Sequence, residues 1–257
     1  MSSSIESSIV FITGGNRGLG RGLVSTYLLR PATTVIAGVR NPLHELAQSL
    51  QQLPVASGSR IIVIEADVAS TPSMQTAIQS LASQGIDRLD LVIANAALTP
   101  SKLEPLLSTP SADIEQMTRT NGLGILNLYR ETQPLLLNSA SPTPAFVHMA
   151  ALTGSNKLAQ TALKSFPMGA FGGSKALGHF FVTKLAGEEQ NQVLIFNLDP
   201  GEVRSETYLQ LRGDYRGDDR SRSPEESAKN VCKIIDGATK ESCHGKFLNE
   251  EGAEAPF

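Results

Sequence analysis

Short apolar runs recur along the chain, and each is followed by a stretch in which apolar residues have helical spacing. Six runs barely alternate with polar residues, which is typical of strands buried on both faces of a parallel sheet. They lie at residues 9–12, 34–37, 61–64, 91–94, 146–149 and 193–196, and a seventh candidate lies at 246–249. This alternation predicts βαβ units, and hence an α/β fold with a parallel sheet of about seven strands.

The predicted helices span residues 17–30, 42–53, 72–84, 112–138, 169–189 and 224–239. Several begin after Ser, Thr or Asn with Pro just inside, which is a common way to start a helix. No repeat, charge block or linker divides the chain. We therefore expect one doubly wound, Rossmann-type domain over residues 1–257, with helices on both faces of the sheet and a disordered N-terminus at 1–7.

In such a sheet, ligands bind beyond the carboxyl ends of the strands. Two longer irregular stretches, residues 152–168 and 202–223, follow the fifth and sixth predicted strands and lie at that end. We expect them to be loops that cover a small-molecule substrate.

Composition and charge argue against several other functions. The chain carries 22 Lys and Arg against 25 Asp and Glu, a net charge of −3, so it has no basic surplus for nucleic acid or an anionic membrane surface. It has neither a signal-peptide pattern nor a run of about 18 apolar residues, so we expect a cytoplasmic protein. Cys232 and Cys243 lack metal-ligand spacing, and no metal site is expected.

A glycine-rich segment at residues 13–20 joins the first predicted strand directly to a helix. There the backbone can approach a pyrophosphate, which the free N–H groups and dipole of the helix N-terminus attract. A tight turn with positive φ at Gly14 and Gly15 would leave Gly18 and Gly20 unexplained, although each costs about 1 kcal/mol in a helix. The predicted nucleotide site includes Gly14, Asn16, Arg17, Gly18, Leu19 and Gly20.

Arg40 follows the second predicted strand, where an acid would bind the ribose 2′-hydroxyl of NAD. A cation at this place suits a 2′-phosphate instead, and Arg17 can add a second one. The sequence therefore favours NADPH over NADH, with a solvated surface arginine as the alternative interpretation of Arg40.

These motifs resemble those of the short-chain dehydrogenases/reductases, and the resemblance covers nearly the whole chain. Residues 13–20 are similar to the family's TGxxxGxG, residues 95–97 to its NAG element, and residues 200–205 to its PGxVxT segment. Residues 21–23, 94–97 and 238–241 look like the corresponding segments of the fungal ketoreductases of aromatic polyketide pathways. They also look like the NADPH-dependent reductase/Diels–Alderases of fungal indole alkaloid pathways.

The resemblance implies roles for individual residues. Asp67 and Val68 would meet the adenine, and Asn121 would be the family's structural and catalytic Asn. Lys175 would hold the nicotinamide ribose. The other residues implied to bind the cofactor are Asn95, Ala96, Pro200, Gly201 and Val203. As in the family, we expect the helices at 112–138 and 169–189 to pack in a homodimer or homotetramer.

The catalytic pattern departs from the family at two hydroxyl groups. The family's Tyr, four residues before the Lys, corresponds to Phe171, and its Ser corresponds to Ala151. Phe cannot donate a proton. The loop before Phe171 is longer than usual in the family, so a substitute hydroxyl could come from Thr153, Ser155, Ser165 or Ser174. We expect His148 and His179 to be packed polar residues rather than acids.

Reduction of a ketone produces an alkoxide that needs a proton, and general acid catalysis is typically worth 10² to 10⁴-fold. Hydride addition to an iminium carbon neutralises an existing charge and needs no such donor. The sequence therefore favours a C=N⁺ substrate, as in the alkaloid enzymes, with hydride transfer coupled to a [4+2] cycloaddition that requires mainly shape and orientation. Residues 151–187 contain no Asp or Glu, which leaves Glu202 as a candidate partner for the cation or as a solvated loop acid.

Two further interpretations stay open. One keeps ketone reduction, with a water or loop hydroxyl in place of the Tyr. The other is a pseudoenzyme that binds NADPH without turnover. The presence of Lys175 and Asn121 favours a catalytic protein, because an idle site has no functional need for either residue.

Overall fold

A computed structural model describes residues 7–189, 192–213 and 220–257 of the chain. The predicted disordered N-terminus at 1–7 therefore lies outside the described residues except for Ser7, which is exposed.

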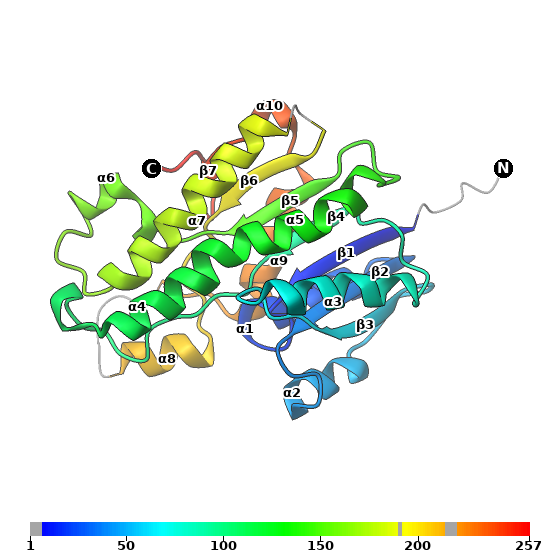
Figure 1. Cartoon of the computed structure of the whole chain (residues 1–257), viewed down its shortest axis with the longest axis horizontal. Coiled ribbons are helices and arrows are strands. Elements are labelled where there is room, and N and C mark those ends of the chain that lie inside the picture. The colour runs from blue at the N-terminus through cyan, green and yellow to red at the C-terminus, as the bar shows by residue number, and fades with distance from the viewer. Residues whose placement is uncertain (1–6, 190–191, 214–219) are drawn as a thin grey trace.

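Seven parallel strands form one sheet with the order β3-β2-β1-β4-β5-β6-β7 (Figure 1). The strands are β1 (Ser8–Thr13), β2 (Thr33–Val39), β3 (Arg60–Glu65), β4 (Leu91–Ala94), β5 (Ala145–Met149), β6 (Leu194–Leu198) and β7 (Phe247–Leu248). The strand order reverses between β1 and β4, which is the position where doubly wound folds bind ligands. The predicted Rossmann-type parallel sheet is confirmed, including its short seventh strand.

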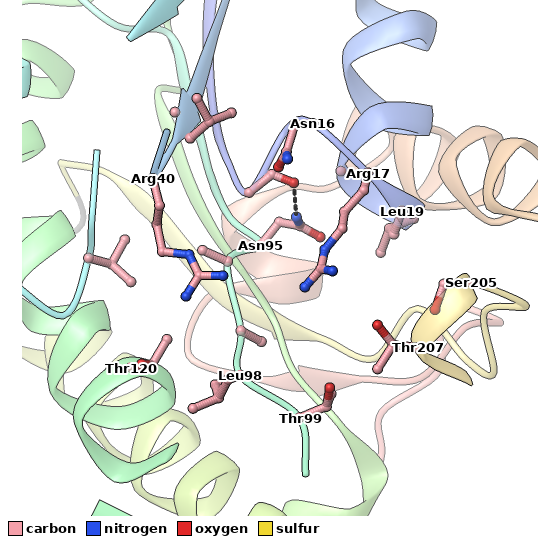
Figure 2. Close-up of a pocket in the computed structure, with 18 of the residues that line it drawn as sticks. Asn16, Arg17, Leu19, Arg40, Asn95, Leu98, Thr99, Thr120, Ser205 and Thr207 are labelled. Carbon is pink, nitrogen blue, oxygen red and sulfur yellow. Dashed lines mark hydrogen bonds between the residues drawn. The ribbon is translucent and has the colours of Figure 1, made fainter. Parts of the chain in front are cut away.

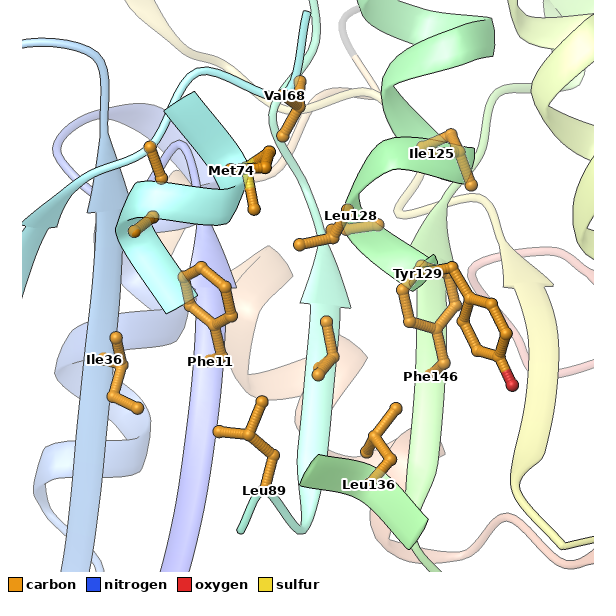
Figure 3. Close-up of a cluster of buried hydrophobic side chains, with 14 of the residues drawn as sticks. Phe11, Ile36, Val68, Met74, Leu89, Ile125, Leu128, Tyr129, Leu136 and Phe146 are labelled. Carbon is orange, nitrogen blue, oxygen red and sulfur yellow. The ribbon is translucent and has the colours of Figure 1, made fainter. Parts of the chain in front are cut away.

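Helices cover both faces of the sheet. The long helices are α1 (Gly18–Leu28), α3 (Thr71–Ala82), α5 (Gly124–Leu137), α7 (Gly169–Glu188) and α9 (Pro224–Asp236). Side chains of α3, α5 and α7 share one core cluster with the strands, and those of α1 and α9 share the other. Figure 3 shows the first cluster, in which the Tyr129 ring meets Phe146 edge to face with centroids 4.9 Å apart.

Local sequence signals explain where two helices begin. Ser70 caps α3 by accepting a hydrogen bond from the backbone N–H of Ser73, and Pro72 lies in the first turn. Ser223 and Glu226 form a reciprocal capping box at α9. Each cap satisfies a helix N–H group that would otherwise have no partner.

Two predicted helices differ in detail. The helix expected at 42–53 is short and tightly wound, and consists of α2 (Glu45–Gln48) followed by a 3₁₀ turn, η1 (Ser49–Gln52). The helix expected at 112–138 changes its winding, from α4 (Ser111–Met117) through a π-helical segment, η3 (Thr118–Leu123), into α5. Such π segments often mark functional sites, and η3 carries Asn121.

The two long loops at the carboxyl edge contain short helices of their own. Residues 152–168 include η4 (Leu152–Gly154) and α6 (Asn156–Ala159). Residues 202–223 include α8 (Glu206–Arg212), while 214–219 lie outside the described residues. The remaining short elements are η2 (Leu106–Ser108) and α10 (Lys240–Cys243).

Within the described ranges, none of the helices is both long and apolar enough to cross a bilayer. The same ranges bring together no group of three or more His, Cys, Asp or Glu side chains that could hold a metal ion.

Candidate active site

The glycine-rich turn after β1 is fixed to the end of β4. Thr13 Oγ1 accepts hydrogen bonds from the N–H groups of Asn95 and Ala96, at 3.1 and 3.0 Å. The Asn95 amide donates to the carbonyls of Thr13 and Gly14, at 2.9 and 3.3 Å. Asn95 therefore holds the turn in shape, and this leaves the N-terminus of α1 open toward the carboxyl edge of the sheet.

Two glycines of this turn have clear structural reasons. Gly14 adopts φ +67°, a conformation that favours glycine. A Cβ on Gly20 would lie 2.1 Å from the carbonyl oxygen of Gly14 and 2.6 Å from Nδ2 of Asn95. The alternative interpretation, a tight turn with positive φ at Gly14 and Gly15, does not hold at Gly15, because Gly18 is the second glycine of this turn with positive φ, at +51°.

A cavity of about 590 Å³ opens at this turn (Figure 2). Most of the residues predicted to bind the cofactor line it: Gly14, Asn16, Arg17, Gly18, Leu19, Gly20, Arg40, Asp67, Val68, Asn95, Ala96 and Val203. Three others, Lys175, Pro200 and Gly201, do not. The Lys175 side chain is buried and its Nζ contacts the carbonyl of Met149, the last residue of β5. Gly201 is packed against the side chain of Glu250.

Three arginines give the cavity a cationic character. Arg17 and Arg40 extend into it from opposite sides (Figure 2). Arg119, on the π-helical segment, also lines it, and the sequence interpretation missed this residue although it lies only two positions before Asn121. Within the described part of the chain, none of these three guanidinium groups has a hydrogen-bond or ion-pair partner, whereas Arg21 donates to Ser49 Oγ at 2.9 Å. The free cations suit an anionic ligand.

Lys175 lies one helical turn after Phe171 on α7, and its side chain is buried. Its Nζ donates to the carbonyl oxygen of Met149 at 2.7 Å and lies 5.9 Å from the centroid of the Phe171 ring. Burial lowers the pKa of Lys175 to about 8, and the charge of Asp199 partly opposes this shift.

Phe171 sits in an apolar cluster, and only 8% of its surface is exposed. The cluster also contains Met117 and Ala170, with Leu98, Ile114, Ala151 and Met168 packed against it. Phe171 and Ala151, which the resemblance places at the family's Tyr and Ser positions, therefore lie in the same apolar environment. Neither can supply a hydroxyl there.

Asn121 connects η3 to the segment after β4 and to α7. Its Oδ1 accepts from the N–H of Leu98 at 2.7 Å, and its Nδ2 donates to the carbonyl of Leu98 at 2.8 Å and to Ser174 Oγ at 2.9 Å. All of its amide groups are used, so the side chain acts as a tie between chain segments.

The four candidate substitute hydroxyls have different surroundings. Ser174 donates to the carbonyl of Phe171 at 2.7 Å, and Ser155 caps α6. Ser165 lies exposed in the loop. Thr153 Oγ1 is buried and has no hydrogen-bond partner within the described chain, which makes it the most available of the four.

The carboxylate at this end of the site is Asp199, which the sequence interpretation missed. Asp199 is 5% exposed and accepts backbone hydrogen bonds from Leu152 and Gly201. Glu202, the residue expected there, is exposed, accepts from the Tyr208 hydroxyl at 3.1 Å and does not line the cavity. The available signal was the position of Asp199 at the carboxyl end of a buried strand.

The comparisons identify the family. The family model described as short chain dehydrogenase matches residues 8–215. The chain belongs to the short-chain dehydrogenases. Membership supports an oxidoreductase that uses a nicotinamide cofactor, and this agrees with the cavity at the first βα turn.

This short-chain dehydrogenase has fungal relatives. It is 40% identical over 253 residues to the short chain dehydrogenase gsfK of Penicillium aethiopicum, covering 95% of this chain and 97% of that protein. It is 33% identical over 254 residues to the norsolorinic acid ketoreductase nor1 of Dothistroma septosporum, covering 96% and 91%. An NADPH-bound carbonyl reductase from chicken fatty liver shares its fold, with a TM-score of 0.85 and 22% identity over 98% of this chain and 100% of the other.

Proposed function

We propose that this short-chain dehydrogenase is an NADPH-dependent reductase. The support comes from the unpartnered guanidinium groups of Arg17, Arg40 and Arg119 around one cavity, because a 2′-phosphate adds negative charge that such groups attract. The bound cofactor would supply a hydride. The chain itself would hold the phosphates at the N-terminus of α1 and place the substrate against the apolar cluster around Phe171.

We expect the protein to bind NADPH at least about tenfold tighter than NADH, a difference that one charge-assisted contact can supply. Arg40→Asp should abolish or reverse this preference, because an acid there repels the 2′-phosphate and accepts from a ribose hydroxyl. Fluorescence titration with both cofactors measures it. Arg130→Asp makes the same charge change at an exposed position of α5 away from the cavity and should leave the preference intact. Equal dissociation constants in the wild type would refute the assignment.

For the reaction itself, we propose hydride delivery to the carbon of an iminium or related C=N⁺ group. The observation that carries this proposal is the apolar environment of Phe171 and Ala151, beside a buried Lys175. The hydride forms the new C–H bond while the C=N⁺ π electrons become a lone pair on nitrogen, so the acceptor atom needs no proton.

The second candidate is ketone reduction, which the name of the Dothistroma relative suggests. Its structural support is Thr153, whose buried hydroxyl has no partner within the described residues. Thr153 also packs against the first turns of α7, because its carbonyl lies 2.4 Å from where a Cβ of Gly172 would be.

A single set of variants separates the two reactions. We would offer a cyclic iminium and an aromatic ketone to the wild type, Phe171→Tyr and Thr153→Val with 4-deuterated NADPH, and locate deuterium in the products. Under the proposal, the wild type labels the iminium-derived carbon, and neither variant changes that rate substantially. Thr153→Val removes a hydroxyl that makes no hydrogen bond, so the fold should be unaffected.

If the wild type reduces only the ketone, and Thr153→Val lowers that rate by roughly 100-fold, the ketone reaction is correct. A large gain of turnover in Phe171→Tyr would also contradict the iminium proposal. If NADPH binds but no acceptor takes up deuterium, the result favours the pseudoenzyme interpretation. The coupled cycloaddition is proposed only for the product of the iminium reduction, and its test is the ratio of cyclised to uncyclised product with and without enzyme.

We also propose that the chain assembles through α5 and α7, which lie side by side on one face (Figure 1). Leu123, at the end of η3, and Leu137 of α5 are each 46% exposed, and Phe180 of α7 is 62% exposed, so this face carries apolar surface that a partner would cover. Light scattering should give a dimer or tetramer at micromolar concentration, and Phe180→Asp should shift it toward the monomer. A monomeric wild type would contradict this.

A further inference from the structure

Three buried side chains hold the backbone that follows β5. Lys175 Nζ donates to the carbonyl of Met149 at 2.7 Å. His179 Nε2 accepts from the N–H of Ala151 at 3.3 Å, and Asp199 Oδ2 accepts from the N–H of Leu152. The strand end and the residue at the family's Ser position are therefore fixed by ionisable groups rather than by packing alone.

Asp199 also holds a second loop. Its Oδ1 accepts from the N–H of Gly201 at 2.5 Å, at the start of the segment that leads to Val203 and the cavity. One carboxylate thus joins the loops that follow β5 and β6. Both of its oxygens are used in this way, and only 5% of the residue is exposed.

The direction of the Asp199 side chain follows from the alternation of side chains along β6. Leu194, Phe196 and Leu198 of β6 pack in the core against α1 and α9, whereas Ile195 packs on the opposite face with α7. By alternation, Asn197 and Asp199 point toward α7 as well. The Asp199 carboxylate consequently faces the side of the sheet that carries Lys175.

We propose that Asp199 is a positioning residue for the proposed hydride transfer: it keeps the Lys175 ammonium charged and fixes the loops on both sides of the catalytic end. The contribution of Asp199 to catalysis rests on the proposed function. The electrostatic part acts through Lys175, because a buried ammonium requires an opposite charge nearby to stay protonated.

Several titratable groups lie around Lys175 and Asp199. Helix α7 contributes Lys175 and His179, β5 contributes His148, and the segment after β7 contributes Glu250. Burial lowers the pKa of His179 to about 3 and that of His148 well below its usual value, so both rings are neutral at pH 7. Burial raises the pKa of Asp199 to about 6, partly offset by the two backbone N–H groups. Lys175 and Asp199 are thus both charged between about pH 6 and pH 8.

The test follows the protonation of Lys175 by NMR of the full-length protein labelled with ¹³C at lysine Cε, with the signal assigned by its loss in Lys175→Arg. In the wild type this signal should titrate near pH 8 and show a second inflection near pH 6, when Asp199 takes up a proton. In Asp199→Asn the main midpoint should fall by about one pH unit, and the inflection near pH 6 should vanish.

Asp90→Asn is the matched control. Asp90 is another buried aspartate, 9% exposed, and accepts from the N–H of Ile9 at 2.8 Å and from the Ser139 hydroxyl at 2.6 Å, just before β4 and so at the opposite edge of the sheet. Its replacement should lower thermal stability without moving the Lys175 midpoint. Asp199→Glu keeps the charge and should hold the midpoint near the wild-type value.

Catalysis gives the second readout. The basic limb of kcat/KM against pH, where Lys175 loses its proton, should lie near 8 in the wild type and move down by about one pH unit in Asp199→Asn, with the remaining loss mainly in kcat. An unchanged Lys175 midpoint in Asp199→Asn would overturn the inference. If Asp199→Asn does not fold, the absence of the inflection near pH 6 in the wild type would overturn it instead. The NMR titration needs no substrate, so failure of the iminium assay alone would reject the proposed reaction and leave the role of Asp199 standing.

Discussion

Replacing Gly20 with alanine should weaken NADPH binding by roughly 100-fold or more, because several hydrogen bonds to a charged pyrophosphate, each worth about 1.5 to 3 kcal/mol, depend on the turn. The new Cβ would lie 2.1 Å from the carbonyl oxygen of Gly14 and 2.6 Å from Nδ2 of Asn95. Both atoms belong to the hydrogen bonds that join the turn to β4. The turn must therefore move away from α1, and the N–H groups at the helix start lose their common direction.

Gly187→Ala is the matched control for this change. Gly187 is also helical, near the end of α7, and a Cβ there would meet nothing within 4 Å. It should leave NADPH affinity unchanged and raise the free energy of unfolding by about 0.5 kcal/mol. Fluorescence titration and thermal unfolding of both variants measure the two effects. NADPH affinity within threefold of wild type in Gly20→Ala would show that the cofactor does not depend on this turn.

The arrangement of the glycine-rich turn and its cavity was largely predictable from the sequence, because strand, turn and helix are contiguous there. The glycine spacing at residues 13–20 indicated a close backbone approach, and Gly20 provides it. Which glycines have positive φ could not be read from the sequence, since this depends on how the turn meets β4. Arg119 was missed because its position in the cavity requires the π-helical winding of η3.

The catalytic end was less predictable. A carboxylate was expected in the loop before α7, and Glu202 was offered either as a candidate partner for the cation or as a solvated loop acid, because the sequence does not show which chain ends meet in space. The direction of the Asp199 side chain becomes clear only once Leu198 of β6 is known to pack in one core cluster and Ile195 in the other. The helix predicted at 42–53 is helical from Glu45 to Gln52 but differs in its winding. His44 caps a helix of a single turn, which a 3₁₀ turn then continues to Gln52.

The burial of Lys175 implies that this residue reduces the stability of the protein while serving its function. Its pKa lies near 8 in the folded chain against an ordinary value of 10.5. Between these values the unfolded chain holds a proton that the folded chain releases, so the stability of the wild type rises with pH over this window. Below pH 8 the full cost of burying the ammonium is present. The attraction to Asp199 is already part of this net shift.

Lys175→Met should therefore stabilise the protein at pH 7 by about 1 to 2 kcal/mol, somewhat less than the pKa shift alone implies, because the carbonyl of Met149 loses its donor. The gain should shrink as the pH rises from 8 to 10.5. Activity should move in the opposite direction. We expect kcat/KM for the accepted substrate to fall by roughly 100-fold, because the proposed reaction depends on the end of β5, which Lys175 holds through the carbonyl of Met149.

Lys184→Met provides the comparison, since it makes the same substitution about two and a half turns further along α7. Lys184 is 59% exposed and lies 3.7 Å from Glu188, so its loss should change stability by less than about 0.5 kcal/mol and leave activity intact. Chemical denaturation at pH 7 and pH 10, with rates measured in parallel, gives both quantities. A Lys175→Met protein that is less stable at pH 7 yet fully active would mean that the ammonium serves the fold. A gain in stability together with a loss of activity identifies a charge that folding alone would not retain.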